Sequence, residues 1–129
     1  MQSGQQALLG LTMLRYKLDV CALSETRIPE DGTENIAIPN SDECYTLYFS
    51  GNPKGGSNGV GFALTKEANK SVIGWNPVSD RLAILRLCCK PIHVSLLAVY
   101  APTNAYDDAE KDLFYEELED VKQSARKIY

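Results

Sequence analysis

The fold class is decided by a short apolar run near the N-terminus, LDVCALS at residues 18–24. Its length and its β-branched content predict a strand that is buried on both faces. Before it, residues 5–17 place Leu8, Leu11 and Leu14 on one helical face, so a helix is expected there. A helix followed by a buried strand is an α/β arrangement, and ligands of such sheets gather beyond the strand ends.

Further strands are predicted downstream, at 45–49 (YTLYF), 59–64 (GVGFAL), 81–87 (RLAILRL) and 92–100 (IHVSLLAVY). The strand at 81–87 is apolar between its arginines, so both of its faces are expected to be covered. A tight turn at Lys90-Pro91 joins the last two strands. In residues 107–129, Asp107 and Glu110 resemble a capping box that opens a helix. Apolar residues then repeat at helical spacing, at Phe114, Leu118, Val121, Ala125 and Ile128.

The glycine-rich residues 51–59 allow two interpretations. Gly51 and Gly56 have the separation found in a phosphate-binding loop, but Ser57 stands where that loop needs lysine. No helix is predicted directly after it. We therefore expect a mobile hairpin connection between two strands.

Composition and charge exclude several classes of protein. A chain of 129 residues fits one domain, and 44% hydrophobic with 23% charged residues exclude a disordered tail and a membrane protein. The net charge of -4 is unsuited to holding nucleic acid by phosphate neutralisation alone, so such a role needs a metal, a basic rim or a larger protein. The apolar residues 7–14 are too short to span a membrane and follow no basic segment, so we expect a cytoplasmic or nuclear location. The cysteines, at positions 21, 44, 88 and 89, lack disulfide or zinc spacing and are expected to be buried small apolar residues.

Polar residues follow two of the predicted strands, at 24–27 (SETR) and 100–104 (YAPTN). If these strand ends lie side by side, Glu25 could bind a divalent cation while Tyr100 and Asn104 steady a phosphate oxygen. Carboxylate and amide oxygens are hard ligands that suit Mg²⁺ or Mn²⁺. The alternative is that Glu25 is a solvated residue that merely ends the strand.

Three segments resemble motifs of one superfamily and occur in its order: 18–27 (LDVCALSETR), 58–64 (NGVGFAL) and 99–104 (VYAPTN). They are similar to the motifs of the endonuclease/exonuclease/phosphatase superfamily. Residues 23–27, 75–81 (WNPVSDR) and 111–115 (KDLFY) look most like the endonuclease domains attached to reverse transcriptases of non-LTR, LINE-type retrotransposons and their domesticated relatives.

The resemblance implies a four-layer α/β sandwich, two face-to-face sheets with helices outside, that hydrolyses phosphodiesters of DNA with Mg²⁺ or Mn²⁺. It implies that Glu25 is the metal-binding carboxylate and that Tyr100 contacts the scissile phosphate. The family's asparagine position holds Thr103, and Asn104 follows one place later as a candidate phosphate contact. Arg81 matches a strand-opening arginine, either as a substrate contact or in a surface ion pair with Asp80.

Several family motifs have no counterpart in the chain. No strand with the first asparagine motif precedes Gln5, and neither the G-D-F-N motif nor the final Asp-His pair is found. His93, the single histidine, lies within a predicted strand and needs no catalytic role. Residues 1–129 are therefore expected to form a partial domain of α/β (α+β) class, with roughly one sheet and two covering helices.

The expected function is that of a fragment of a metal-dependent endonuclease, inactive as the isolated chain. The alternative is a non-catalytic remnant or interaction module that retains part of the fold. The inner faces of the strands ending at Leu64, Leu87 and Tyr100 would then lack a partner sheet, so self-association or aggregation is expected.

Overall fold

The computed structural model describes residues 1, 3–102 and 106–126. The helices are α1 (Ser3–Tyr16), α2 (Lys66–Asn69) and α3 (Asp108–Arg126). The strands are β1 (Val20–Ser24), β2 (Gly32–Ala37), β3 (Cys44–Asn52), β4 (Gly55–Thr65), β5 (Val72–Pro77), β6 (Leu82–Cys89) and β7 (Ile92–Val99). None of the helices within these ranges is long and apolar enough to cross a membrane.

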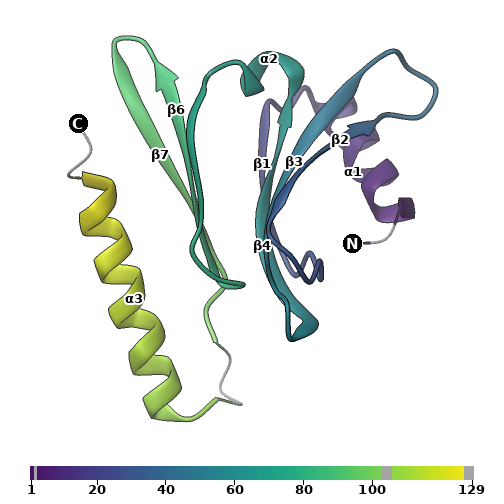
Figure 1. The fold of residues 1–129 in the computed structure, drawn as a ribbon. Coiled ribbons are helices and arrows are strands. Elements are labelled where there is room, and N and C mark those ends of the chain that lie inside the picture. The colour runs from purple at the N-terminus through teal and green to yellow at the C-terminus, as the bar shows by residue number, and fades with distance from the viewer. Residues whose placement is uncertain (2, 103–105, 127–129) are drawn as a thin grey trace.

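The strands form two antiparallel sheets, in the orders β1-β4-β3-β2 and β5-β6-β7. In Figure 1 the layers run from α1 through the first sheet and the second sheet to α3. The predicted α+β class is confirmed. The expectation of roughly one sheet is wrong, because the chain leaves β4 through α2 and begins a new sheet at β5.

The main hydrophobic core lies between the two sheets. Trp75 of β5 makes edge-to-face contacts across the gap, with ring centroids 5.4 Å from Tyr48 and 6.2 Å from Phe62. The prediction that the inner faces of these strands lack a partner sheet is therefore wrong, since each sheet covers the other. The buried members of this core are Tyr48, Val60, Phe62 and Leu64 of the first sheet and Ala83, Leu85, Leu87 and Ala98 of the second.

A second core lies between α1 and the outer face of the first sheet. The helix approaches closely at Gly10, where an added Cβ would lie 2.9 Å from Ile38 Cγ1 and 3.0 Å from Tyr45 Cε1. Met13 is buried beside it, and the Tyr45 hydroxyl donates to the Gln6 carbonyl at 2.8 Å. The helix predicted at 5–17 is confirmed.

The leucine stripe of α1 faces away from this core. Leu8, Leu11 and Leu14 are 65%, 42% and 41% exposed. The helix buries the side that carries Gly10, because only a residue without a side chain allows so close a backbone approach.

Two strand predictions differ from the structure. β1 is only partly buried along its length, because it is an edge strand paired with β4 alone, so the prediction of burial on both faces is wrong. The hairpin predicted between β3 and β4 is present, but the strands pair as far as Asn52 and Gly55, which leaves Pro53 and Lys54 as the turn. The expected long connection is thus mostly strand.

The C-terminal elements follow the sequence pattern. The turn at Lys90-Pro91 joins β6 to β7, and β6 is buried along most of its length, as predicted. α3 begins after Asp107, whose Oδ1 accepts from the backbone N–H of Glu110 at 2.8 Å. Phe114 is its buried anchor, at 7% exposed. Ile128 lies outside the described residues.

Candidate functional site

The site lies where β1 and β7 end beside each other. The Tyr100 hydroxyl donates to Glu25 Oε1 at 2.8 Å, although the two residues are 75 positions apart in the sequence. Each side chain follows directly after its strand, β1 ending at Ser24 and β7 at Val99. The structure therefore brings together the two residues for which the sequence predicted a shared site.

The backbone at Glu25 is held in an unusual conformation. Glu25 and Arg27 have φ values of 53° and 57°, in the left-handed region that side chains larger than glycine seldom adopt. Two hydrogen bonds hold this turn, from Thr26 N–H to the Gly59 carbonyl at 3.1 Å and from Arg27 N–H to the Asn58 carbonyl at 2.9 Å. Backbone of this kind persists where its surroundings over-determine it, and it is concentrated at functional sites.

Residues 58–59, which accept the hydrogen bonds from this turn, are themselves hydrogen-bonded to Asp80. Asn58 and Gly59 also have positive φ, 61° and 96°. Gly59 N–H donates to the Asp80 carbonyl at 2.9 Å, and Asn58 Nδ2 donates to Asp80 Oδ2 at 2.9 Å. A Cβ at Gly59 would collide with the hydroxyl of Thr26, which is fully buried behind it. We call these three segments, residues 25–27, 58–59 and 80–81, the site platform.

Arg81 connects the platform to the aromatic side of the site. Its Nη1 donates to the Tyr100 carbonyl at 3.1 Å, and its Cζ lies 5.4 Å from the centre of the Tyr100 ring. The same guanidinium lies 4.6 Å from the centre of the Tyr106 ring. The sequence left two roles open for Arg81, a substrate contact or a surface ion pair with Asp80. In the structure the Asp80 carboxylate accepts a hydrogen bond from Asn58. The guanidinium of Arg81 fixes the position of Tyr100.

Tyr106 is a site residue that the sequence analysis missed. It lies in the segment between β7 and α3, and nothing in its spacing distinguishes it from other exposed tyrosines. Only the fold brings its ring over Arg81. Asn104, the predicted phosphate contact, lies outside the described residues.

The environment of Tyr100 keeps its hydroxyl protonated. Its hydrogen bond to Glu25 raises the pKa of the phenol above its ordinary value of 10.0, and partial burial and the charge of Glu25 add to this. The positive charge of Arg81 acts in the opposite direction. Tyr100 is therefore protonated at neutral pH, and it donates its single hydroxyl hydrogen to Glu25.

Few side chains at this end of the sandwich could bind a metal ion. Within residues 3–102 and 106–126, no group of three or more His, Cys, Asp and Glu side chains could hold a metal ion. Glu25 is exposed and offers a carboxylate, the ligand type that Mg²⁺ prefers. Mg²⁺ keeps several of its waters and is often held by one or two carboxylates together with substrate phosphates. Glu25 could therefore serve as one ligand of such an ion, but it does not form a complete metal site by itself.

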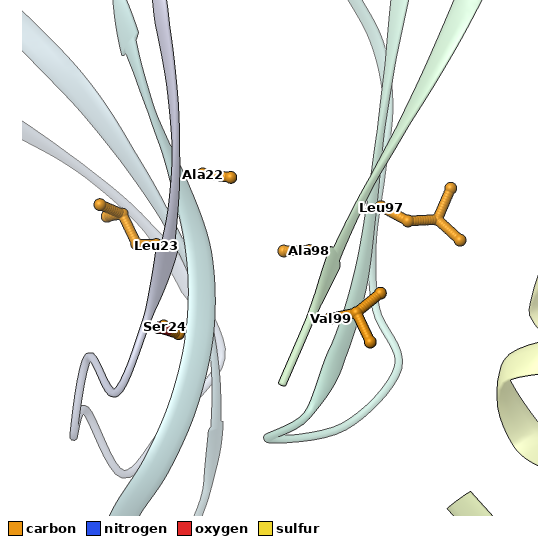
Figure 2. A pocket seen from close by; sticks show the side chains of 6 residues that line it. All are labelled: Ala22, Leu23, Ser24, Leu97, Ala98 and Val99. Carbon is orange, nitrogen blue, oxygen red and sulfur yellow. The ribbon is translucent and has the colours of Figure 1, made fainter. Parts of the chain in front are cut away.

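A cleft of about 290 Å³ opens beside the Glu25–Tyr100 pair, between β1 and β7. Figure 2 shows Ala22 and Ala98 pointing into the gap, while Leu23, Leu97 and Val99 point away from it. With Ser24, these residues line the cleft, and none of them carries an ionisable side chain. Because the larger side chains point away, the cleft is bordered by small side chains, and its lining is polar as well as apolar.

His93 lies at the other end of β7, seven residues before Tyr100, with Cys88 as its neighbour on β6. At roughly 3.3 Å per residue of strand, that separation is about 23 Å. This position agrees with the interpretation of His93 as a strand residue, since its imidazole cannot reach the Glu25–Tyr100 pair.

Comparison with known proteins gives two curated relatives. Both are named craniofacial development protein 2, one from Bos taurus and one from Tragulus javanicus, and each is 30% identical over 128 residues. The match covers 99% of this chain and 21% of each relative, so the chain spans about a fifth of the length of the relatives it matches. That name states no reaction, metal or substrate. No family model and no solved structure matches the chain.

Proposed function

We propose that this chain is part of a divalent-metal-dependent phosphodiesterase domain of the endonuclease/exonuclease/phosphatase type, akin to the DNA endonucleases of LINE-type retrotransposons. The observation that carries the proposal is the 2.8 Å hydrogen bond between Tyr100 and Glu25 at neighbouring strand ends. Two motifs that are distant in the sequence thereby meet at one point. The layered arrangement of two facing sheets with helices outside also supports it.

The geometry suggests a distinct role for each residue. Glu25 would bind Mg²⁺ through its carboxylate, and the ion would neutralise the charge that grows on the phosphoryl oxygens. Tyr100 would turn its single hydroxyl hydrogen bond from Glu25 to a phosphate oxygen, because its phenol remains protonated at neutral pH. Arg81 would keep the Tyr100 ring in place through its bonds to the carbonyl and the ring face.

The chain by itself lacks an imidazole to activate water at this point, because His93 lies about 23 Å away along β7. We therefore propose that the 129-residue chain does not cleave DNA alone, and that residues of a longer protein complete the site. In such a longer protein, Glu25→Gln should abolish Mg²⁺-dependent nicking of supercoiled plasmid.

The metal-binding half of the proposal can be tested on this chain. Titration with Mn²⁺ should broaden the amide NMR signals of residues 24–27 and 100–101 first, because a paramagnetic ion relaxes nearby nuclei most strongly. Glu25→Gln should remove this selective broadening. Glu30→Gln is the matched control, since Glu30 is an exposed carboxylate in the adjoining loop, and it should leave the pattern unchanged.

Broadening that is uniform over the surface, or that persists in Glu25→Gln, would remove Glu25 from any metal site. In that case a non-catalytic interaction module becomes the better description of the chain.

A further inference from the structure

Arg81 holds the backbone of Tyr100 at both of its peptide groups. The Tyr100 N–H donates to the Arg81 carbonyl at 2.9 Å, which is a contact between two backbones. The Tyr100 carbonyl accepts from Arg81 Nη1 at 3.1 Å, which is a contact that depends on where the Arg81 side chain lies. The orientation of the peptide group between Tyr100 and Ala101 therefore depends on the position of the guanidinium.

The Arg81 guanidinium is held by aromatic rings and not by a counter-ion. Among the described residues it forms no ion pair with a carboxylate, and the neighbouring Asp80 carboxylate accepts from Asn58. Its Cζ lies 4.6 Å from the centre of the Tyr106 ring and 5.4 Å from the centre of the Tyr100 ring. Fixing a long arginine side chain costs rotamer freedom, which attraction between the cation and the ring faces helps to offset. Tyr106 makes the closer of the two ring contacts.

The position of Tyr106 is set by the start of α3, which lies beside the second sheet in Figure 1. The next residue, Asp107, caps this helix, because its Oδ1 accepts from the Glu110 N–H at 2.8 Å. Phe114 of the same helix is buried. The backbone of Tyr106 is thus attached to a capped and anchored helix, while its ring, which is 37% exposed, contacts Arg81.

We propose that Tyr106 is a positioning residue that acts on Tyr100 through Arg81. The Tyr106 ring keeps the guanidinium beside Tyr100, and the guanidinium keeps the Tyr100 hydroxyl directed at Glu25 Oε1, 2.8 Å away. α3 thereby takes part in aligning the site. The consequence for phosphodiester cleavage rests on the proposed function, but the contacts themselves need neither metal nor substrate and are tested without them.

Amide ¹⁵N relaxation of this chain tests the proposal. The probe is the Ala101 N–H, because it shares a peptide group with the Tyr100 carbonyl. In Tyr106→Ala its order parameter should fall from about 0.85 to below about 0.6, whereas that of the Tyr100 N–H, bound to the Arg81 backbone, should change little. Nuclear Overhauser contacts between the Tyr100 ring and the Glu25 side chain should weaken in the same variant. Tyr106→Phe keeps the ring and should preserve both signals.

Tyr16→Ala is the matched control for the loss of an exposed tyrosine. Tyr16 also has a guanidinium over its ring, with Arg15 Cζ 5.4 Å from the ring centre. It ends α1 before β1 begins, whereas Glu25 follows the other end of β1. This variant should leave both signals unchanged.

A double variant decides whether Tyr106 acts through Arg81. Arg81→Ala alone should loosen the Ala101 N–H as much as Tyr106→Ala does, and combining the two should add nothing further. An unchanged order parameter in Tyr106→Ala, an equal loss in Tyr106→Phe, or a further fall in the double variant would overturn the proposal. If Arg81→Ala unfolds, the comparison of Tyr106→Ala with Tyr106→Phe still decides. Binding of Mn²⁺ at Glu25 tests the proposed function separately.

Discussion

Replacing Gly59 by alanine should damage the platform that holds Glu25. Gly59 has a φ of 96°, and an added Cβ would collide with the buried Thr26 hydroxyl and lie 3.1 Å from the Arg27 nitrogen. The strained φ and the forced displacement of Thr26 together should lower the free energy of unfolding by about 2 to 4 kcal/mol. With a urea m-value of roughly 2 kcal/mol/M, the midpoint should fall by about 1 to 2 M.

The measurement is urea unfolding followed by circular dichroism, with Gly55→Ala as the matched control. Gly55 begins the same strand, and an added Cβ there meets no atom within 4 Å, so the midpoint of this variant should stay near that of the unaltered chain. If Gly59→Ala unfolds at the same urea concentration as Gly55→Ala, then the platform is not held as described. The hydrogen bonds of Thr26 and Arg27 to this hairpin would then not position Glu25.

Three further variants test the core and the site. Leu64 is 0% exposed between the sheets, so Leu64→Ala should lower the free energy of unfolding by about 2 to 5 kcal/mol in chemical denaturation. Leu8 is 65% exposed, so Leu8→Ala should change it by about 0.5 kcal/mol or less. Equal losses would contradict the two-sheet core. Burial, with a smaller effect of Glu34, raises the pKa of Tyr45 to about 12. The folded state therefore keeps a proton that the unfolded state loses above pH 10, so stability should fall between pH 10 and 12, and less steeply in Tyr45→Phe, as denaturation at each pH would show. Glu25→Ala should lower the pKa of Tyr100 toward 10.0 in a phenol titration by NMR, and an unchanged pKa would refute the Glu25–Tyr100 bond.

The sequence predicted well those elements whose residue pattern follows directly from their burial or from a local contact. β6 is apolar on both faces because it is the central strand of its sheet, and β7 follows it after a short turn. The N-terminus of α3 could be predicted because a cap is a local contact, here between Asp107 and Glu110.

The strands that the sequence did not predict are edge strands. β2, with the sequence GTENIA, is mostly polar, and β5 is interrupted by Gly74 and Pro77. An edge strand has one neighbour and one exposed side, so it needs neither a long apolar run nor strict alternation. Without β5, the sequence does not reveal a second sheet, and it therefore predicts roughly one sheet where the structure has two.

The candidate site was predictable only in part. Glu25 and Tyr100 follow strands that the sequence reveals, so their meeting could be expected. The left-handed turn at Glu25 and its bonds to Gly59 depend on contacts between distant segments. The stacking of Arg81 on Tyr106 is likewise a product of the tertiary fold.

The single tryptophan gives this fold an internal optical probe. Trp75 lies on β5, and its ring contacts Tyr48 and Phe62 of the opposite sheet. Its fluorescence therefore depends on whether the two sheets are in contact, whereas far-ultraviolet circular dichroism depends on the strands themselves. Coincident transitions of the two signals would identify the sandwich as one cooperative unit. Red-shifted emission at retained ellipticity would identify a state in which the strands persist while water has entered between the sheets.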